Sequence, residues 1–309
     1  MTNHIPMLKQ YFKCLVRISL LILPLSVSSQ SIDKKLERKI QQEIKTFNGD
    51  FGIYVKNLKT NKVVEINADT IFPTASIVKV PLLIGIFQQV ADGKMKLEDK
   101  FKYQSKRAYG GSGLMQFYKD SADTDLSTMI SLMLTYSDNV TSIWIQELAG
   151  GGASINPLLA KYGLKDTRVN SRTTGREKEW EKYGWGQTTP KEMAEIFSLI
   201  RQGKIIDERY SDRMYRYLKN QYYNERSLSQ LPATVNTISK TGSVNKSRGE
   251  VVLVNAPSGD YVFCILTKNN KDESWTNKNE AEVLTRKISS IIWNHFEPKH
   301  QFKNYIPID

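Results

Sequence analysis

The hydrophobic positions near the start of this chain follow two successive spacings. The first apolar residues recur every three or four positions, which predicts an amphipathic helix. They are Ile32, Leu36, Ile40, Ile44 and Phe47. Apolar runs at 51–55 and 63–66, joined by the turn-rich segment 57–61, then predict two strands.

From residue 76 to about residue 218 the spacing is largely helical. The predicted helices occupy 76–91, 125–136, 141–148, 155–162, 190–201 and 207–218. Strand patterns return after them, and a last amphipathic helix closes the chain. These elements occupy 236–240, 250–254, 261–267 and 280–295.

This order of elements predicts an α/β fold. Strands divided between the two ends of a chain usually form one antiparallel sheet, here flanked by the terminal helices, with an all-α lobe inserted beside it. We place the α/β lobe at about 31–70 and 232–297 and the α lobe at about 71–231. A cleft between the two lobes is then the natural place for a binding site.

Residues 1–29 have the pattern of a signal peptide. A basic stretch precedes the apolar run 18–27, and small residues follow, so cleavage is expected before Gln30. The run is too short to span a bilayer comfortably, so we expect no stable membrane anchor. The domain at 30–309 is therefore predicted to be secreted or periplasmic, and to be a monomer.

Composition narrows the chemistry. Cleavage leaves 309 − 29 = 280 residues with a net charge of 12 − 3 = +9, because three basic residues leave with the signal peptide. The basic residues are scattered along an exported chain, which argues against a nucleic-acid partner. His4 is removed, and His295 and His300 lie in the C-terminal tail. A Ser-His-Asp triad or a multi-histidine zinc site is therefore improbable, and we expect no metal and no cofactor.

A serine and a lysine at 76 and 79 offer a different base. Pro73 and Thr74 form a plausible helix entry, so Ser76 falls in the first turn with Lys79 three residues on. Residues three apart share a helix face, which brings the ammonium beside the hydroxyl. The helix N-terminus favours negative charge developing on Ser76, and burial lowers the pKa of a lysine toward that of a useful base.

Two further motifs lie at the ends of predicted elements. Ser137-Asp138-Asn139 stands between two helices, where such residues are also common helix caps. Lys240-Thr241-Gly242-Ser243 ends a strand, where a simple β-turn is the alternative. All three motifs, in this order and facing the lobe boundary, are unlikely to be a coincidence.

Together the three motifs resemble those of penicillin-recognising serine enzymes, the group that contains class A β-lactamases and penicillin-binding proteins. The context of Ser76, the segment 134–139, Glu147-Leu148-Ala149-Gly150-Gly151, Thr188-Thr189-Pro190 and Arg248-Gly249 are similar to the class A pattern. The resemblance spans roughly residues 33–295.

The resemblance implies a role for each matching position. Ser76 would be the acylated nucleophile and Lys79 its base, while Ser137 passes the proton to the leaving nitrogen. The N–H groups of Ser76 and Ser243 would form the oxyanion hole. Substrate binding would fall to Asn139, Thr241, Ser243, Lys240 and Arg248, although one residue is missing between Lys240 and Arg248 compared with the family.

The family's deacylating glutamate has no counterpart. Thr173 stands at its expected position, and no Glu-x-x-Leu-Asn follows in this loop. Glu177 and Glu179 are the candidates for a substitute base, but we favour the alternative that they are surface carboxylates paired with Arg176 or Lys178.

The leading prediction is a β-lactamase-like serine hydrolase acylated at Ser76 by β-lactams. The alternatives are a peptidoglycan D-Ala-D-Ala peptidase or transpeptidase, and a penicillin-binding protein that deacylates slowly. In each case the substrate is a small β-lactam or a cell-wall peptide.

Overall fold

The computed structural model describes residues 30–300 and residue 302, so the predicted signal peptide lies outside the described residues. The chain builds a six-stranded sheet in the order β1-β3-β2-β11-β10-β9. The strands are β1 Ser31–Ile32, β2 Asp50–Asn57, β3 Lys62–Ile66, β9 Thr237–Val244, β10 Ser247–Val254 and β11 Tyr261–Lys268. All pairs are antiparallel except β1 with β3. The predicted antiparallel sheet is thus confirmed, apart from a parallel edge strand that was not predicted.

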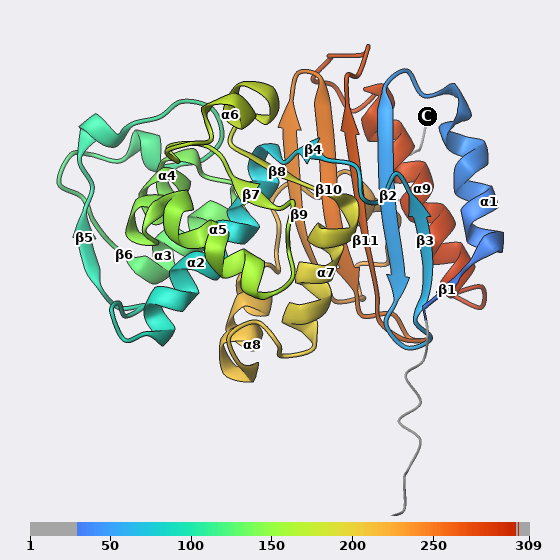
Figure 1. Ribbon diagram of the computed structural model, residues 1–309, viewed down its shortest axis with the longest axis horizontal. Helices are drawn as coiled ribbons and strands as arrows, with labels where there is room; N and C mark the ends of the chain where they lie inside the picture. The colour runs from blue at the N-terminus through green and yellow to red at the C-terminus, as the bar shows by residue number, and fades with distance from the viewer. Residues whose placement is uncertain (1–29, 301, 303–309) are drawn as a thin grey trace, which may run out of the picture.

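Helices cover both faces of this sheet (Figure 1). α1 Lys34–Glu43 and α9 Glu280–Phe296 share a core with Val252, whereas α7 Pro190–Arg201 shares a core with Val251. Successive strand residues point to opposite faces, so β10 is apolar on both. This explains why its second half, residues 251–254, is a continuous apolar run and not an alternation.

The remaining large helices lie beside the sheet (Figure 1). α2 Lys79–Ala91 is buried along most of its length, and a helix that is apolar all round needs partners on every side. Those partners are α3 Leu126–Thr135, α4 Asn139–Leu148, α5 Gly151–Lys161 and α8 Glu208–Tyr217. The predicted α/β class with a helical block next to the sheet is confirmed, while the lobe boundaries near 70 and 232 stay a prediction.

Among the described residues, six helices begin at a side chain that accepts a hydrogen bond from their first turn, which satisfies an N–H without an intrahelical partner. These caps are Asp33 of α1, Asp125 of α3, Asp138 of α4, Thr189 of α7, Asp207 of α8 and Asn279 of α9.

Two local features differ from the prediction. The α-helix predicted from residue 76 begins at Lys79, because Ala75–Val78 form a 3₁₀ turn, η2. The segment before α7 is also more ordered than its sequence indicates, since strands of two or three residues carry no periodicity. It contains β7 Arg168–Val169, α6 Glu177–Tyr183 and β8 Gly186–Thr188, and β8 pairs with β4 Phe72–Pro73.

Within the described part of the chain, no helix is long and apolar enough to cross a membrane.

The contact between β2 and β4 gives a stability test. A Cβ on Gly52 would lie 2.6 Å from the Phe72 ring and 3.0 Å from Pro190. We therefore expect Gly52→Ala to lower the free energy of unfolding by about 1–3 kcal/mol through overpacking. Gly110→Ala is the matched control, since a Cβ there meets nothing within 4 Å. Chemical denaturation of both variants checks this, and equal stabilities would contradict the packing argument.

Candidate active site

Ser76 lies in the tight turn η2 that joins β4 to α2. Ala75 before it has a φ of 44°, a left-handed conformation that a non-glycine residue keeps only when its surroundings fix it. The Ile77 N–H donates to the Thr74 carbonyl at 2.9 Å and closes the turn. This turn directs Ser76 and Lys79 to the same side.

The Lys79 side chain is fully buried and lies at the centre of the site. Its Nζ is 3.0 Å from Ser76 Oγ, 3.0 Å from Ser137 Oγ and 3.0 Å from Asn139 Oδ1, and it also contacts the Ser137 carbonyl. Ser76 and Lys79 therefore lie side by side, as predicted, and Ser137 and Asn139 of the second motif contact the same amine.

The second motif forms the turn between α3 and α4. Asp138 is buried, caps the first turn of α4, and accepts hydrogen bonds from the N–H groups of Leu114 and Met115 at 2.6 and 2.8 Å. Both explanations of the motif therefore hold at once. Asp138 is a helix cap, and the turn that it fixes brings Ser137 and Asn139 to Lys79.

The third motif brings a second buried cation. Lys240 Nζ donates to Ser137 Oγ at 3.1 Å and to the Thr241 carbonyl at 3.0 Å. The motif's glycine is required by sterics, because a Cβ on Gly242 would lie 2.4 Å from the carbonyl oxygen of Thr74. Only a glycine lets β9 approach η2 this closely.

Both ammonium groups are energetically costly inside the protein. Burial, and next the positive charge of Lys240, hold the pKa of Lys79 well below its usual value, against an opposing effect of Asp138. Burial and Arg226 lower the pKa of Lys240 to about 7, while Glu250 opposes the shift. Since Lys79 and Lys240 share one hydroxyl, their protonation states are coupled.

Two cavities meet at this cluster. One has a volume of about 590 Å³ and the other about 760 Å³, and both are lined by Ser76, Asn139 and Ser243. Ser76 thus lies where a substrate can extend in two directions.

The comparisons with known proteins agree with this geometry. A model described as the β-lactamase enzyme family matches residues 35–296. The chain belongs to the β-lactamase enzyme family. It is 21% identical to β-lactamase VEB-1 of Pseudomonas aeruginosa over 299 residues, covering 92% of this chain and 99% of the relative. It is 23% identical to β-lactamase SME-1 of Serratia marcescens over 267 residues, covering 82% and 88%.

Solved structures show the same fold. The structure of PBP-A matches with a TM-score of 0.77 and 25% identity, covering 87% of this chain and 98% of the other. A class A β-lactamase from Mycobacterium abscessus matches with a TM-score of 0.75 and 18% identity, covering 84% and 99%. The predicted family, and the assignment as a serine hydrolase of the class A type, are confirmed.

Arg226 is a site residue that the sequence analysis missed. Its guanidinium donates to Ser243 Oγ at 2.5 Å and to the Gly249 carbonyl at 2.9 Å, and it pairs with Glu282. Arg226 precedes a short 3₁₀ turn, and Glu282 lies in α9. No local sequence pattern marks Arg226 as a site residue. Its place in the site depends on the ion pair with Glu282, which is distant in the sequence.

Arg248, which was predicted to bind substrate, lines the second cavity, but its guanidinium is largely occupied. It donates to backbone carbonyls of Val244, Asn245, Ser247 and Ser274. Its Nε also lies 3.4 Å from Glu282, which pairs with Arg226 as well. Arg248 therefore stabilises the turn between β9 and β10 and helps to hold Glu282 in place.

The structure does not bring the two candidate bases to Ser76. Of the described residues that line either cavity, none is Glu177 or Glu179. The Glu177 carboxylate is exposed and accepts from the Gly175 N–H at 3.0 Å; its own N–H and that of Gly175 lower its pKa. Thr173, at the family's glutamate position, faces α5, since a Cβ on Gly152 would lie 2.0 Å from its Oγ1.

The contact of Gly242 with η2 predicts a loss of function larger than the loss of stability. Gly242→Ala must push β9 away from η2 and move Ser243 from Ser76. We expect about a hundredfold slower labelling of Ser76 by a fluorescent penicillin, the size of effect seen when one oxyanion donor is lost. Gly52→Ala is the control for overpacking outside the site. Labelling of Gly242→Ala at the wild-type rate would show that the close approach is not needed.

The coupling of the two lysines predicts a pH effect. The predicted role of Lys79 as the base needs its neutral form, so the acylation rate should fall on the acid side with an apparent pKa far below that of free lysine. Lys240→Ala removes a nearby positive charge, which raises the pKa of Lys79 and moves this acid limb to higher pH. Stopped-flow acylation rates against pH measure the shift, with exposed Lys94→Ala as control. An unmoved limb would disprove the coupling.

Proposed function

We propose that this chain is a β-lactamase-like serine hydrolase in which β-lactams acylate Ser76. The observation that carries the proposal is the position of Lys79 Nζ, 3.0 Å from Ser76 Oγ and 3.0 Å from Ser137 Oγ. A buried amine with a lowered pKa beside a serine is the arrangement that activates a weak nucleophile.

The acylation step follows from these contacts. Neutral Lys79 takes the proton of Ser76 as Oγ bonds to the β-lactam carbonyl carbon. The N–H groups of Ser76 and Ser243 stabilise the resulting oxyanion. When the carbon–nitrogen bond breaks, Ser137 donates its proton to the leaving nitrogen and is reprotonated by Lys79. The product is an ester at Ser76, and Lys79 is neutral again.

The substrate carboxylate belongs on the Arg226 side of the site. The second cavity is lined by Thr241, Ser243 and Arg226. The buried amine of Lys240 donates to the Thr241 carbonyl and so lies next to this lining. Opposite charge from Lys240 and Arg226 would hold the carboxylate, while Asn139 would bind the substrate amide and keep Lys79 in place. Arg248 supports this region indirectly through Glu282.

Deacylation is the weaker half of the cycle. It requires a base aimed at a water molecule next to the ester. The carboxylates that line the second cavity, Glu225 and Glu282, lie beside or pair with Arg226. The described lining of the first cavity includes no carboxylate. This favours the second candidate function, a penicillin-binding protein or cell-wall peptidase that holds its acyl-enzyme. A PBP-A variant, L158E, has itself been solved as an acyl-enzyme complex with penicillin G.

The remaining assignments are proposals from the sequence. Residues 1–29 would direct export, so the domain acts in the periplasm or outside the cell as a monomer without a stable membrane anchor. β-Lactams or cell-wall peptides reach it there. Antibiotic resistance would follow only as far as the acyl-enzyme is released.

Fast acylation followed by slow release should be visible directly. A general base contributes roughly 10²–10⁴-fold to such a step. Mixing with a chromogenic cephalosporin should therefore give a burst of one equivalent and then weak turnover. Intact-protein mass spectrometry should show the adduct for minutes.

Ser76→Ala should abolish both the burst and the adduct, whereas Ser105→Ala, an exposed serine outside the site, should keep them. Rapid turnover instead of a burst would require a substitute base. An acyl-enzyme that accumulates only in Glu177→Gln, or only in Glu179→Gln, would identify it.

A further inference from the structure

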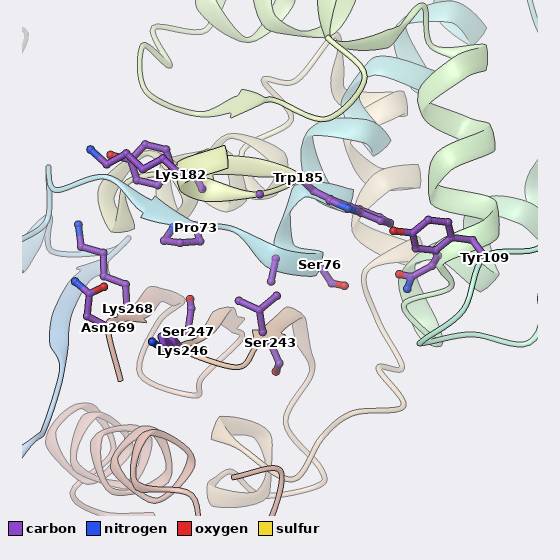
Figure 2. A pocket seen from close by; sticks show the side chains of 15 residues that line it. Pro73, Ser76, Tyr109, Lys182, Trp185, Ser243, Lys246, Ser247, Lys268 and Asn269 are labelled. Atoms are coloured by element: carbon purple, nitrogen blue, oxygen red, sulfur yellow. The ribbon is translucent and has the colours of Figure 1, made fainter. Parts of the chain in front are cut away.

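The cavity of about 590 Å³ has an uneven charge distribution. Ser76, Tyr109 and Trp185 lie toward one end, whereas Lys182, Lys246 and Lys268 lie toward the other (Figure 2). The three lysines come from α6, the β9–β10 turn and the end of β11. Chain segments far apart in sequence therefore place three ammonium groups around the part of the cavity that is remote from the nucleophile.

Lys268 is the most firmly placed of the three. Its Nζ donates to the Ile71 carbonyl at 2.8 Å and lies 4.8 Å from the centre of the Phe72 ring. These contacts, with a carbonyl and an aromatic face, orient the ammonium without neutralising it. Lys182 is similar, since its Nζ lies 5.0 Å from the centre of the Tyr183 ring.

The nearby carboxylates only partly balance this charge. Lys246 Nζ is 3.7 Å from Glu273 in an exposed pair. Asp50 accepts from Asn269 at 2.8 Å. Neither acid is among the described residues that line the cavity. Concave sites lined by charges of one sign raise the local concentration of the opposite ion.

From this arrangement we propose that the lysine end of the cavity binds an anionic group at the end of the acyl side chain. The preferred substrates are then acyl donors with two carboxylates. One carboxylate meets Arg226 and Thr241, and the other, several atoms beyond the reactive carbonyl, meets Lys182, Lys246 and Lys268. This inference rests on the proposed acylation of Ser76 and specifies the class of acyl donor that this reaction favours.

The test uses penicillins that differ only at the tip of the side chain. A 6-aminopenicillanic acid acylated with hexanoate ends in a methyl group, while the adipoyl derivative ends in a carboxylate. Succinoyl and suberoyl derivatives vary the reach, and 6-aminohexanoyl reverses the charge. Second-order acylation rates are measured by competition with a fluorescent penicillin and by mass spectrometry of the Ser76 adduct.

We expect at least one carboxylate-ended penicillin to acylate Ser76 about fivefold faster than its methyl-ended partner at low salt, because partly exposed charge pairs each contribute a small factor. The amine-ended compound should be slower than both. The preference should shrink toward one in 0.5 M salt, where the Debye length is about 4 Å. A peptide ending in D-Ala-D-Ala, with and without an acidic side chain before it, shows whether cell-wall peptides share the preference.

Variants locate the effect. Lys268→Met and Lys182→Met keep most of the apolar stem and remove the charge, so each should reduce the ratio of the carboxylate-ended to the hexanoyl rate measured on the same variant. Lys102→Met, at an exposed lysine paired with Asp123, is the matched control. Equal rates for all side-chain tips, or an undiminished preference in the variants, would overturn the inference and leave acylation of Ser76 intact. Absence of labelling by every compound would instead overturn the proposed function, and the inference with it.

Discussion

The site depends on two buried ammonium groups that share one hydroxyl. Lys79 and Lys240 both approach Ser137 Oγ, at 3.0 and 3.1 Å, and both are fully shielded from solvent. Burial and mutual repulsion both disfavour the charged form of each amine, so the two positive charges destabilise one another. Folding therefore holds the pKa of the Lys79 amine, next to Ser76, well below its usual value. The chemistry follows from the burial that the rest of the chain enforces.

Much of the surrounding structure can be understood as the means of keeping these groups together. Asp138 ties the turn that carries Ser137 to the N–H groups of Leu114 and Met115. Gly242 lets β9, with Lys240, approach within contact of Thr74. Each contact is made by a different segment, so the site forms only when the helical region has packed against the sheet. This dependence explains why the three short motifs are informative only as a set.

The sequence was sufficient to predict those elements and residues that a local pattern marks. The long helices and the strands of the sheet follow from periodicity, and Ser76, Lys79, Ser137 and Lys240 follow from motifs at the ends of those elements. It was insufficient where the structure depends on distant partners. Arg226 has no signature of its own, because its position is set by Glu282 in α9. The turn at Ala75 was likewise missed, since no propensity rule favours a positive φ at alanine.

The loop between α5 and α7 bears on the slow deacylation proposed above. Where the family has a carboxylate, Thr173 turns toward Gly152 on α5 and donates to the Ser171 carbonyl at 3.1 Å. Gln146 also donates to that carbonyl, at 2.6 Å, so the loop is held to α4 at Ser171. Moving the loop at Ser171 would cost this buried hydrogen bond of Gln146 without replacement. The carboxylates of this loop are absent from the described linings of both cavities that Ser76 lines, which is the geometric basis of the slow release proposed above.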